Sequence, residues 1–147
     1  LADGGLPPSM LEIEITESVA MQSPDIVLPR LAALKQMGVC VAIDDFGTGY
    51  SSLSSLEKLA ADRLKIDRSF VMGLDAGEGG GSLAGMIIDL GRSLGLTVIA
   101  EGVETATQRQ RLIGLGCDEL QGYLFSPPLT VERLPEWLAT HSAGIPS

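Results

Sequence analysis

A unit of helix, glycine and strand occurs three times along the chain. In each copy a leucine-rich helical stretch stops at a glycine, and a short run of aliphatic residues follows at once; the glycines are Gly38, Gly95 and Gly116. Glycine suits the residue after a helix because it adopts positive φ without a steric penalty. Helices and strands that alternate through short connections indicate parallel strands joined by right-handed crossovers. The repeated unit therefore predicts an α/β fold with a parallel sheet.

Five segments are predicted as strands, and apolar residues at helical spacing predict a helix after each of them. The strands are residues 11–15, 39–43, 63–66, 97–100 and 120–125, and the helices are residues 24–37, 53–59, 82–94, 105–115 and 130–139. A closed (β/α)8 barrel requires eight strands. No glycine-rich dinucleotide or P-loop fingerprint is present. The glycine run at residues 77–81 is interpreted as a mobile surface connection rather than a phosphate loop.

Composition narrows the function classes. The chain has 147 residues, a net charge of −9 and 45% apolar residues, which predicts one acidic domain with a real core. Without a basic excess, nucleic-acid binding is not expected. The longest apolar run, residues 39–43, is too short to span a membrane, and no signal peptide opens the chain, so a cytoplasmic location is expected. Two cysteines and one histidine predict neither a disulfide scaffold nor a zinc site.

Each predicted strand has an acidic, amide or ammonium side chain near its carboxyl end, which is the active-site face of α/β folds. These residues are Glu14, Glu17, Asp44, Asp45, Lys65, Asp67, Glu101, Glu104 and Gln121. An alternative interpretation is that they cap the following helices. Capping suits Glu17, Asp67 and Glu104, whereas Asp44 and Glu101 precede glycine-containing loops and fit it poorly.

Several carboxylates at one mouth must share protons or bind cations, because like charges raise each other's pKa. Oxygen donors without a histidine cluster favour Mg²⁺, Mn²⁺ or Ca²⁺. Two such ions can activate a water for phosphodiester hydrolysis. Asp44 and Asp45 would point to opposite sides of a strand unless the backbone turns, and residues 46–49 could supply that turn. Lys65 could orient the water, or it could be a structural ion pair.

These residues, in this order, resemble the EAL family of cyclic di-GMP phosphodiesterases. The matching stretches are residues 12–17, 44–53, 64–67, 99–104 and 121–128, within a resemblance that runs from about Met10 to Leu138. The most specific are Asp-Asp-Phe-Gly-Thr-Gly-Tyr-Ser at residues 44–51 and Ala-Glu-Gly-Val-Glu at residues 100–104. The resemblance implies a TIM-like (β/α)8 barrel and hydrolysis of cyclic di-GMP to linear pGpG.

The resemblance also implies a role for each matching residue. Metal ligands would be Glu14, Asp44, Asp45 and Glu101, with Asp44 bridging two ions of Mg²⁺ or Mn²⁺ and with inhibition by Ca²⁺. Lys65 would hold the nucleophilic water, and Gln121 would lie beside it. Glu17 would brace the loop after the second strand, and Glu104 would lie behind the metal ligands. Phe125, Pro127 and Pro128 would form the pocket wall beside a guanine.

The Glu-Ala-Leu signature and an Asn-bearing strand, which both carry metal ligands in the family, are absent from the chain. Residues 1–139 are therefore expected to be a partial EAL domain without its N-terminal third, and residues 140–147 a flexible tail. An incomplete five-strand portion would expose two sheet edges and much apolar interior, so we expect a homodimer or pairing with the rest of the barrel. The parent chain could carry a regulatory or GGDEF-type domain, or a membrane anchor elsewhere.

Two other functions stay open at this point. A receptor could hold cyclic di-GMP without cleaving it, although such relatives typically lose acidic ligands and none is lost here. A lyase acting through an enolate or a Lys65 Schiff base would be detected by borohydride trapping with a carbonyl substrate.

The 147-residue chain alone is predicted to hydrolyse cyclic di-GMP little or not at all, because two metal ligands of the family lie outside it. Chromatography of the products after incubation with cyclic di-GMP and Mn²⁺ measures this. Robust formation of pGpG by these 147 residues would contradict the fragment hypothesis.

Overall fold

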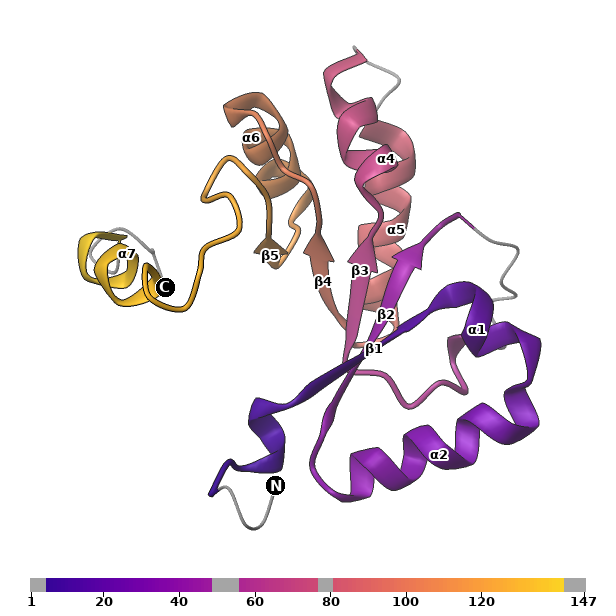
Figure 1. Cartoon of the computed structure of the whole chain (residues 1–147). Helices are drawn as coiled ribbons and strands as arrows, with labels where there is room; N and C mark the ends of the chain where they lie inside the picture. Colours follow the sequence, from indigo (N-terminus) through magenta and orange to yellow (C-terminus); the bar gives the residue numbers. More distant parts are fainter. Residues whose placement is uncertain (1–4, 49–55, 77–80, 142–147) are drawn as a thin grey trace.

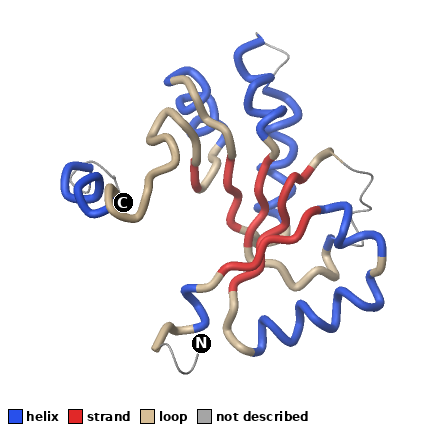
Figure 2. The backbone as a smooth tube through the Cα atoms, viewed as in Figure 1, coloured by secondary structure: helices blue, strands red, loops and turns tan. Residues whose placement is uncertain are grey.

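A computed structural model of the chain describes residues 5–48, 56–76 and 81–141. Five strands form one sheet in the order β1-β2-β3-β4-β5, and every neighbouring pair is parallel (Figure 1, Figure 2). The strands are β1 (Glu12–Thr16), β2 (Cys40–Phe46), β3 (Arg63–Ile66), β4 (Thr97–Ala100) and β5 (Glu119–Leu120). The predicted parallel α/β sheet of five strands is confirmed.

Helical segments connect the strands. They are η2 (Pro8–Met10), α1 (Glu17–Gln22), α2 (Pro24–Gln36), α4 (Arg68–Met72), η3 (Gly73–Ala76), α5 (Gly81–Ser93), α6 (Ala106–Leu115) and α7 (Leu134–His141). The helices predicted at 24–37, 82–94 and 105–115 agree with α2, α5 and α6 to within a residue or so, whereas the short helices α1 and α4 were not predicted. Residues 53–55 of the predicted helix at 53–59 and residues 77–80 of the glycine run lie outside the described residues. In the described part of that predicted helix only Leu56 is helical, and residues 57–59 form a turn and a bend. Of the helices in the described part, none is long and apolar enough to cross a membrane.

Helices α1, α2, α4, α5 and α6 pack against one face of the sheet, whereas α7 lies apart from it (Figure 1). On that face Ile43, Leu64 and Val98 are fully buried and cluster with Ile88 of α5 and Leu112 of α6. Side chains alternate between the two faces of a strand, so the residues between these apolar ones point to the opposite, concave face. The core thus fixes which side chains the sheet presents on its concave face.

Two predicted boundaries near the C-terminus are wrong. The strand expected at 120–125 ends at Leu120, because the chain turns there: the backbone N–H of Phe125 donates to the oxygen of Gly122 at 3.1 Å. The helix expected at 130–139 begins at Leu134, after a turn in which the N–H of Leu134 donates to Thr130.

Thr140 and His141, which were expected to open a flexible tail at residues 140–147, belong to α7. The ring of His141 stacks on that of Trp137, with centroids 4.5 Å apart, which ties the last turn of the helix to the preceding one. Residues 142–147 lie outside the described part of the chain.

Gly91 allows α5 to lie close to the sheet. A Cβ at this position would be 2.4 Å from Cγ2 of Val98 and 3.4 Å from Cδ2 of Leu64. We expect Gly91→Ala to lower the free energy of unfolding by about 1–3 kcal/mol, the usual cost of overpacking a core. This cost exceeds the gain in helix propensity of about 1 kcal/mol. Urea denaturation measures the difference.

Gly114→Ala is the matched control, because Gly114 lies in α6 with no neighbouring atom within 4 Å of an added Cβ. It should raise stability by about 0.4–1 kcal/mol. Equal stabilisation by both substitutions would contradict the close approach of α5 to β4.

Candidate active site at the carboxyl ends of the strands

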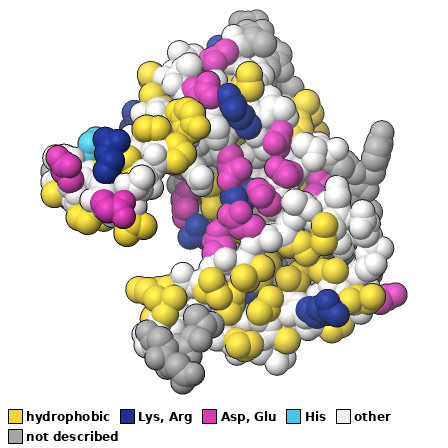
Figure 3. Space-filling view, in the orientation of Figure 1, with side chains coloured by type: hydrophobic (Ala, Val, Ile, Leu, Met, Phe, Trp, Pro, Cys, Tyr) yellow, Lys and Arg dark blue, Asp and Glu magenta, His cyan; other side chains and the backbone are white. Residues whose placement is uncertain are grey.

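The concave face of the sheet is charged. Residues two apart on each strand share this face, and they line a cavity of about 400 Å³: Glu12 and Glu14 of β1, Arg63 and Lys65 of β3, and Glu119 with Gln121 at β5. Figure 3 shows acidic side chains gathered in the centre of this face around basic ones. The expectation of an exposed apolar interior is therefore wrong for the described residues, because polar side chains alternate with apolar ones along these strands.

Lys65 is the centre of the cluster. Its Nζ lies 2.5 Å from Glu14, 2.7 Å from Glu101 and 3.4 Å from Asp44, and the residue is 5% exposed. Burial by itself would lower the pKa of the ammonium, but the hydrogen bonds to Glu101 and Glu14 outweigh it and the pKa of Lys65 is raised. The cluster brings together side chains from four neighbouring parts of the sheet.

Asp44 and Asp45 are separated by a turn in the backbone at Asp45 itself. Asp45 has φ = 52°, the left-handed region, and the pairing of β2 with β3 shifts register between Ile43 and Phe46. The backbone N–H of Asp45 donates to Oδ1 of Asp44 at 3.0 Å. The hydroxyl of Thr48 donates to the backbone carbonyl oxygen of Asp45 at 2.9 Å. The turn therefore begins at Asp45, earlier than the glycine-rich stretch 46–49 in which it was expected.

The pKa of Asp45 is raised, first by desolvation and then by the negative charges of Asp44 and Asp67. Ionisation of Asp45 therefore costs free energy in the folded chain. A cation bound beside Asp45 would remove part of that cost.

Glu17 lies behind this turn. It is 2% exposed, and its Oε2 accepts a hydrogen bond from the backbone N–H of Gly47 at 2.9 Å. Gly47 follows β2 directly and has φ = 98°. The N-cap of α1 is Thr16, whose side chain accepts from the N–H of Val19, and Glu17 is the first residue of the helix.

The loop after β4 carries Glu101 and Glu104 in different directions. Glu101 reaches Lys65, whereas Glu104 accepts from Arg68 at 2.6 Å on the helix side. Asp67, for which capping was one interpretation, accepts from the N–H of Ser69 at 2.9 Å and so caps α4.

The cavity includes four of the predicted site residues: Glu14, Lys65, Gln121 and Phe125. Asp44 and Glu101 do not line the cavity, but both contact Lys65, which does. Asp45, Pro127 and Pro128 are exposed and do not line it. Among the described residues, then, the structure brings together the metal-ligand candidates except Asp45, and it leaves the two prolines of the expected pocket wall outside.

A second row of ion pairs was not predicted. Arg63 stands two residues before Lys65 on β3. Its guanidinium lies 3.2 Å from Glu12 and 3.0 Å from Glu119, so these ion pairs join β3 to β1 and β5 across the concave face. The signal was available in the sequence, since Glu12, Arg63 and Glu119 each stand two residues before Glu14, Lys65 and Gln121. An alternating strand places such residues on the same face.

Over residues 5–48, 56–76 and 81–141, no group of three histidine, cysteine, aspartate or glutamate side chains is arranged to hold a metal ion. The Lys65 ammonium instead lies between Glu14, Asp44 and Glu101. The donor set nevertheless fits a divalent cation: its members are hard oxygen ligands, and they already converge on one positive charge.

This fold is that of a known family. The EAL domain family matches residues 1–128, and the chain belongs to it. Its sheet and helices are a five-strand portion of the TIM-like barrel of that family.

Two curated relatives come from Pseudomonas aeruginosa. The bifunctional diguanylate cyclase/cyclic di-GMP phosphodiesterase MucR is 48% identical over 129 residues, which is 88% of this chain and 19% of MucR. The cyclic di-GMP phosphodiesterase NbdA is 45% identical over 141 residues, which is 96% of this chain and 18% of NbdA. The chain thus spans less than a fifth of either relative.

Solved structures of relatives contain ligands. The PaMucR phosphodiesterase in complex with c-di-GMP superposes with a TM-score of 0.87 at 47% identity, covering 91% of this chain and 54% of the other. BlrP1 from Klebsiella pneumoniae, in complex with manganese and cyclic di-GMP, has a TM-score of 0.80 at 37% identity and covers 87% of this chain and 33% of the other. Another BlrP1 structure contains calcium in place of manganese.

We expect Asp45→Asn to raise Tm slightly at pH 7 in the presence of a chelator. Asparagine tolerates the left-handed region and removes a charge whose ionisation the fold disfavours. Because the pKa of Asp45 is raised above its unfolded value, this penalty is complete above the folded pKa and absent below the unfolded pKa. The advantage of the variant should therefore shrink as the pH falls towards 4, which calorimetry at several pH values measures.

Asp45→Ala separates the charge from the backbone. It removes the same charge but lowers the free energy of unfolding by about 1 kcal/mol or more, because alanine has a Cβ and no polar group to stabilise the left-handed conformation. A Tm for Asp45→Asn below that of the unsubstituted chain at pH 7 would contradict the interpretation of the raised pKa.

Proposed function

We propose that this chain supplies the metal-binding and water-positioning part of a phosphodiesterase that hydrolyses cyclic di-GMP to linear pGpG. The observation that carries the proposal is the convergence of Glu14, Asp44 and Glu101 on Lys65 beside an open cavity. Membership of the EAL domain family and the cyclic di-GMP complexes of relatives support it.

Glu14, Asp44, Asp45 and Glu101 would hold Mg²⁺ or Mn²⁺, and two ions are proposed. Bound there, the cations would polarise the phosphodiester and lower the pKa of a water. The left-handed backbone of Asp45 interrupts the alternation of the strand, so that Asp44 and Asp45 would both be available to a pair of ions. Calcium, with its longer and more flexible coordination, is proposed to bind without supporting turnover.

Lys65 would orient the attacking water and stabilise negative charge on the phosphodiester oxygens. An ammonium has three donors and no acceptor, so Lys65 positions the water by donating hydrogen bonds. Its place between the carboxylates holds it at the mouth of the cavity. Gln121, exposed beside the cavity, would add a further polar contact to the water or the substrate.

Other residues would shape and support the site. Glu17 would keep the loop after β2 in place through Gly47, and Glu104 would support the loop after β4 through Arg68. The aromatic ring of Phe125, which is 40% exposed, would form the wall beside a guanine base, with Pro127 and Pro128 completing it once the substrate is bound.

The assembly around the site is also part of the proposal. The two outer strands, β1 and β5, each pair on one side only among the described residues, so the remaining barrel strands or a second copy would cover them. We propose residues 1–139 as part of an EAL domain in a longer, cytoplasmic or membrane-anchored protein. That protein would act as a homodimer and carry a regulatory or GGDEF-type domain.

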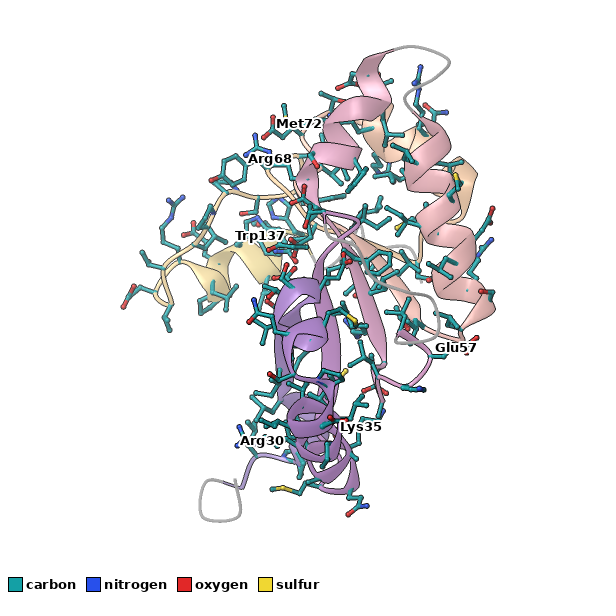
Figure 4. All side chains as sticks on the ribbon, turned by 90° about the vertical axis from the view of Figure 1, so that its right-hand side faces the viewer. Arg30, Lys35, Glu57, Arg68, Met72 and Trp137 are labelled. Carbon is teal, nitrogen blue, oxygen red and sulfur yellow. The ribbon has the colours of Figure 1, made fainter. Side chains whose placement is uncertain are left out.

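Glu101→Gln in the full-length protein is expected to reduce hydrolysis of cyclic di-GMP with Mn²⁺ by about 10²-fold or more, because the substitution removes a ligand charge and the partner of Lys65. Separation of pGpG from substrate over time measures the rate. Glu57→Gln is the matched control, since Glu57 is exposed and lies away from the labelled Arg68 and Trp137 in Figure 4; its rate should not change.

Two outcomes would contradict the proposal. Unchanged turnover in Glu101→Gln would remove Glu101 from the site. Cyclic di-GMP that is bound and recovered intact by the unsubstituted protein with Mn²⁺ would indicate a receptor instead of an enzyme.

A further inference from the structure

A buried glutamine holds the loop between β4 and α6, residues 101–105. Gln108 is 3% exposed, and its Oε1 accepts hydrogen bonds from the backbone N–H groups of Glu104 at 2.7 Å and Thr105 at 3.1 Å. The N–H of Gln108 in turn donates to the hydroxyl of Thr105 at 3.1 Å. The end of the loop and the start of α6 are therefore fixed by one reciprocal capping box.

The other half of the same amide reaches a different element. Nε2 of Gln108 donates to Oδ2 of Asp75, on η3, at 2.8 Å. A capping box needs only the helix that it caps, so this bond adds a tertiary anchor. Because both halves of a buried amide must find partners, Asp75 also fixes which end of the Gln108 amide faces the loop.

The segment that carries Asp75 lies along the whole loop. At its start, Arg68 pairs with Glu104 at 2.6 Å, and a Cβ on Gly102 would lie 2.4 Å from Cγ of Arg68. Further along, Arg111 of α6 donates to the carbonyl oxygen of Leu74. Figure 4 shows Arg68 and Met72 at the two ends of α4, on the segment that leads into η3. The segment 68–76 thus supports the loop between β4 and α6.

The opposite side of the loop meets the proposed site. The Glu101 N–H donates to the oxygen of Ile66 at 3.2 Å, while the Glu101 carboxylate lies 2.7 Å from Lys65. Two residues later, the backbone N–H of Val103 donates to the backbone carbonyl oxygen of Gln121 at 3.0 Å. Movement of this loop would therefore displace both Glu101 and Gln121.

We propose that Gln108 is a positioning residue for the site, which acts through Asp75 to hold the loop that carries Glu101 and Glu104. The inference rests on the proposed function. Residues that orient metal ligands typically affect metal affinity or activity by about 10- to 100-fold when they are substituted. Loss of the Asp75–Gln108 contact should have an effect in this range although neither residue lines the cavity.

An isosteric exchange of polarity tests this anchor. Gln108→Glu keeps the acceptor for the loop but places a second carboxylate against Asp75, so it should weaken Mn²⁺ binding and lower kcat about 10-fold or more. Adding Asp75→Asn restores a hydrogen bond between the two side chains with its direction reversed. The double variant should recover to within about 3-fold of the unsubstituted protein. The measurements are calorimetric titration with Mn²⁺ and steady-state hydrolysis of cyclic di-GMP by the full-length protein.

Gln110→Glu is the control for added charge on the same helix, because Gln110 is exposed. It should leave Mn²⁺ affinity and kcat unchanged. A Gln108→Glu variant that is folded, has a lower Tm and keeps both quantities within about 2-fold overturns the positioning role, as does failure of Asp75→Asn to rescue it.

The failure of the proposed function would look different. If the unsubstituted protein neither binds Mn²⁺ nor hydrolyses cyclic di-GMP, the proposed function is overturned, and hydrogen exchange at the amides of Glu104 and Thr105 then tests the anchor alone. Faster exchange in Gln108→Glu that the double variant reverses supports the anchor. Unchanged exchange overturns it.

Discussion

The buried ammonium of Lys65 is the constraint on which the concave face depends. It lies on β3 and is held by Glu14 from β1, Asp44 from β2 and Glu101 from the end of β4. A one-residue slip of any of these strands would move its charged residue to the helix side, where the core admits no unpaired charge. The cluster thus ties the chemistry of the site to the register of the sheet.

The two faces of the sheet have different roles. On the helix side, apolar side chains and the close approach of Gly91 to Val98 fix the positions of the strands. On the concave side, the ion pairs form two rows, one around Arg63 and one around Lys65. Because the same strands supply both faces, packing against the helices sets the spacing of the carboxylates that would receive a divalent cation.

Much of this arrangement could be predicted from the sequence. Glycine-terminated helices that alternate with short aliphatic runs were enough to predict five parallel strands, and the carboxyl ends of parallel strands meet at one edge. For that reason Glu14, Asp44, Lys65 and Glu101 could be expected to lie together. Specific motifs then indicated the family, because few folds place such residues in that order.

Other features required the fold. The left-handed backbone of Asp45 depends on a shift of pairing between β2 and β3, and nothing in its neighbours along the chain specifies that shift. The short β5 depends on the turn at Gly122, and the bond between Gln108 and Asp75 joins residues 33 positions apart.

The sequence by itself determined the alternation of helix and strand and the acidic character of the site, since these follow from local patterning and composition. Only the tertiary structure decided which carboxylates touch Lys65 and how the loop after β4 is anchored. Those contacts depend on distances between elements that are remote in sequence, and such distances are set by the packing of the helices on the sheet.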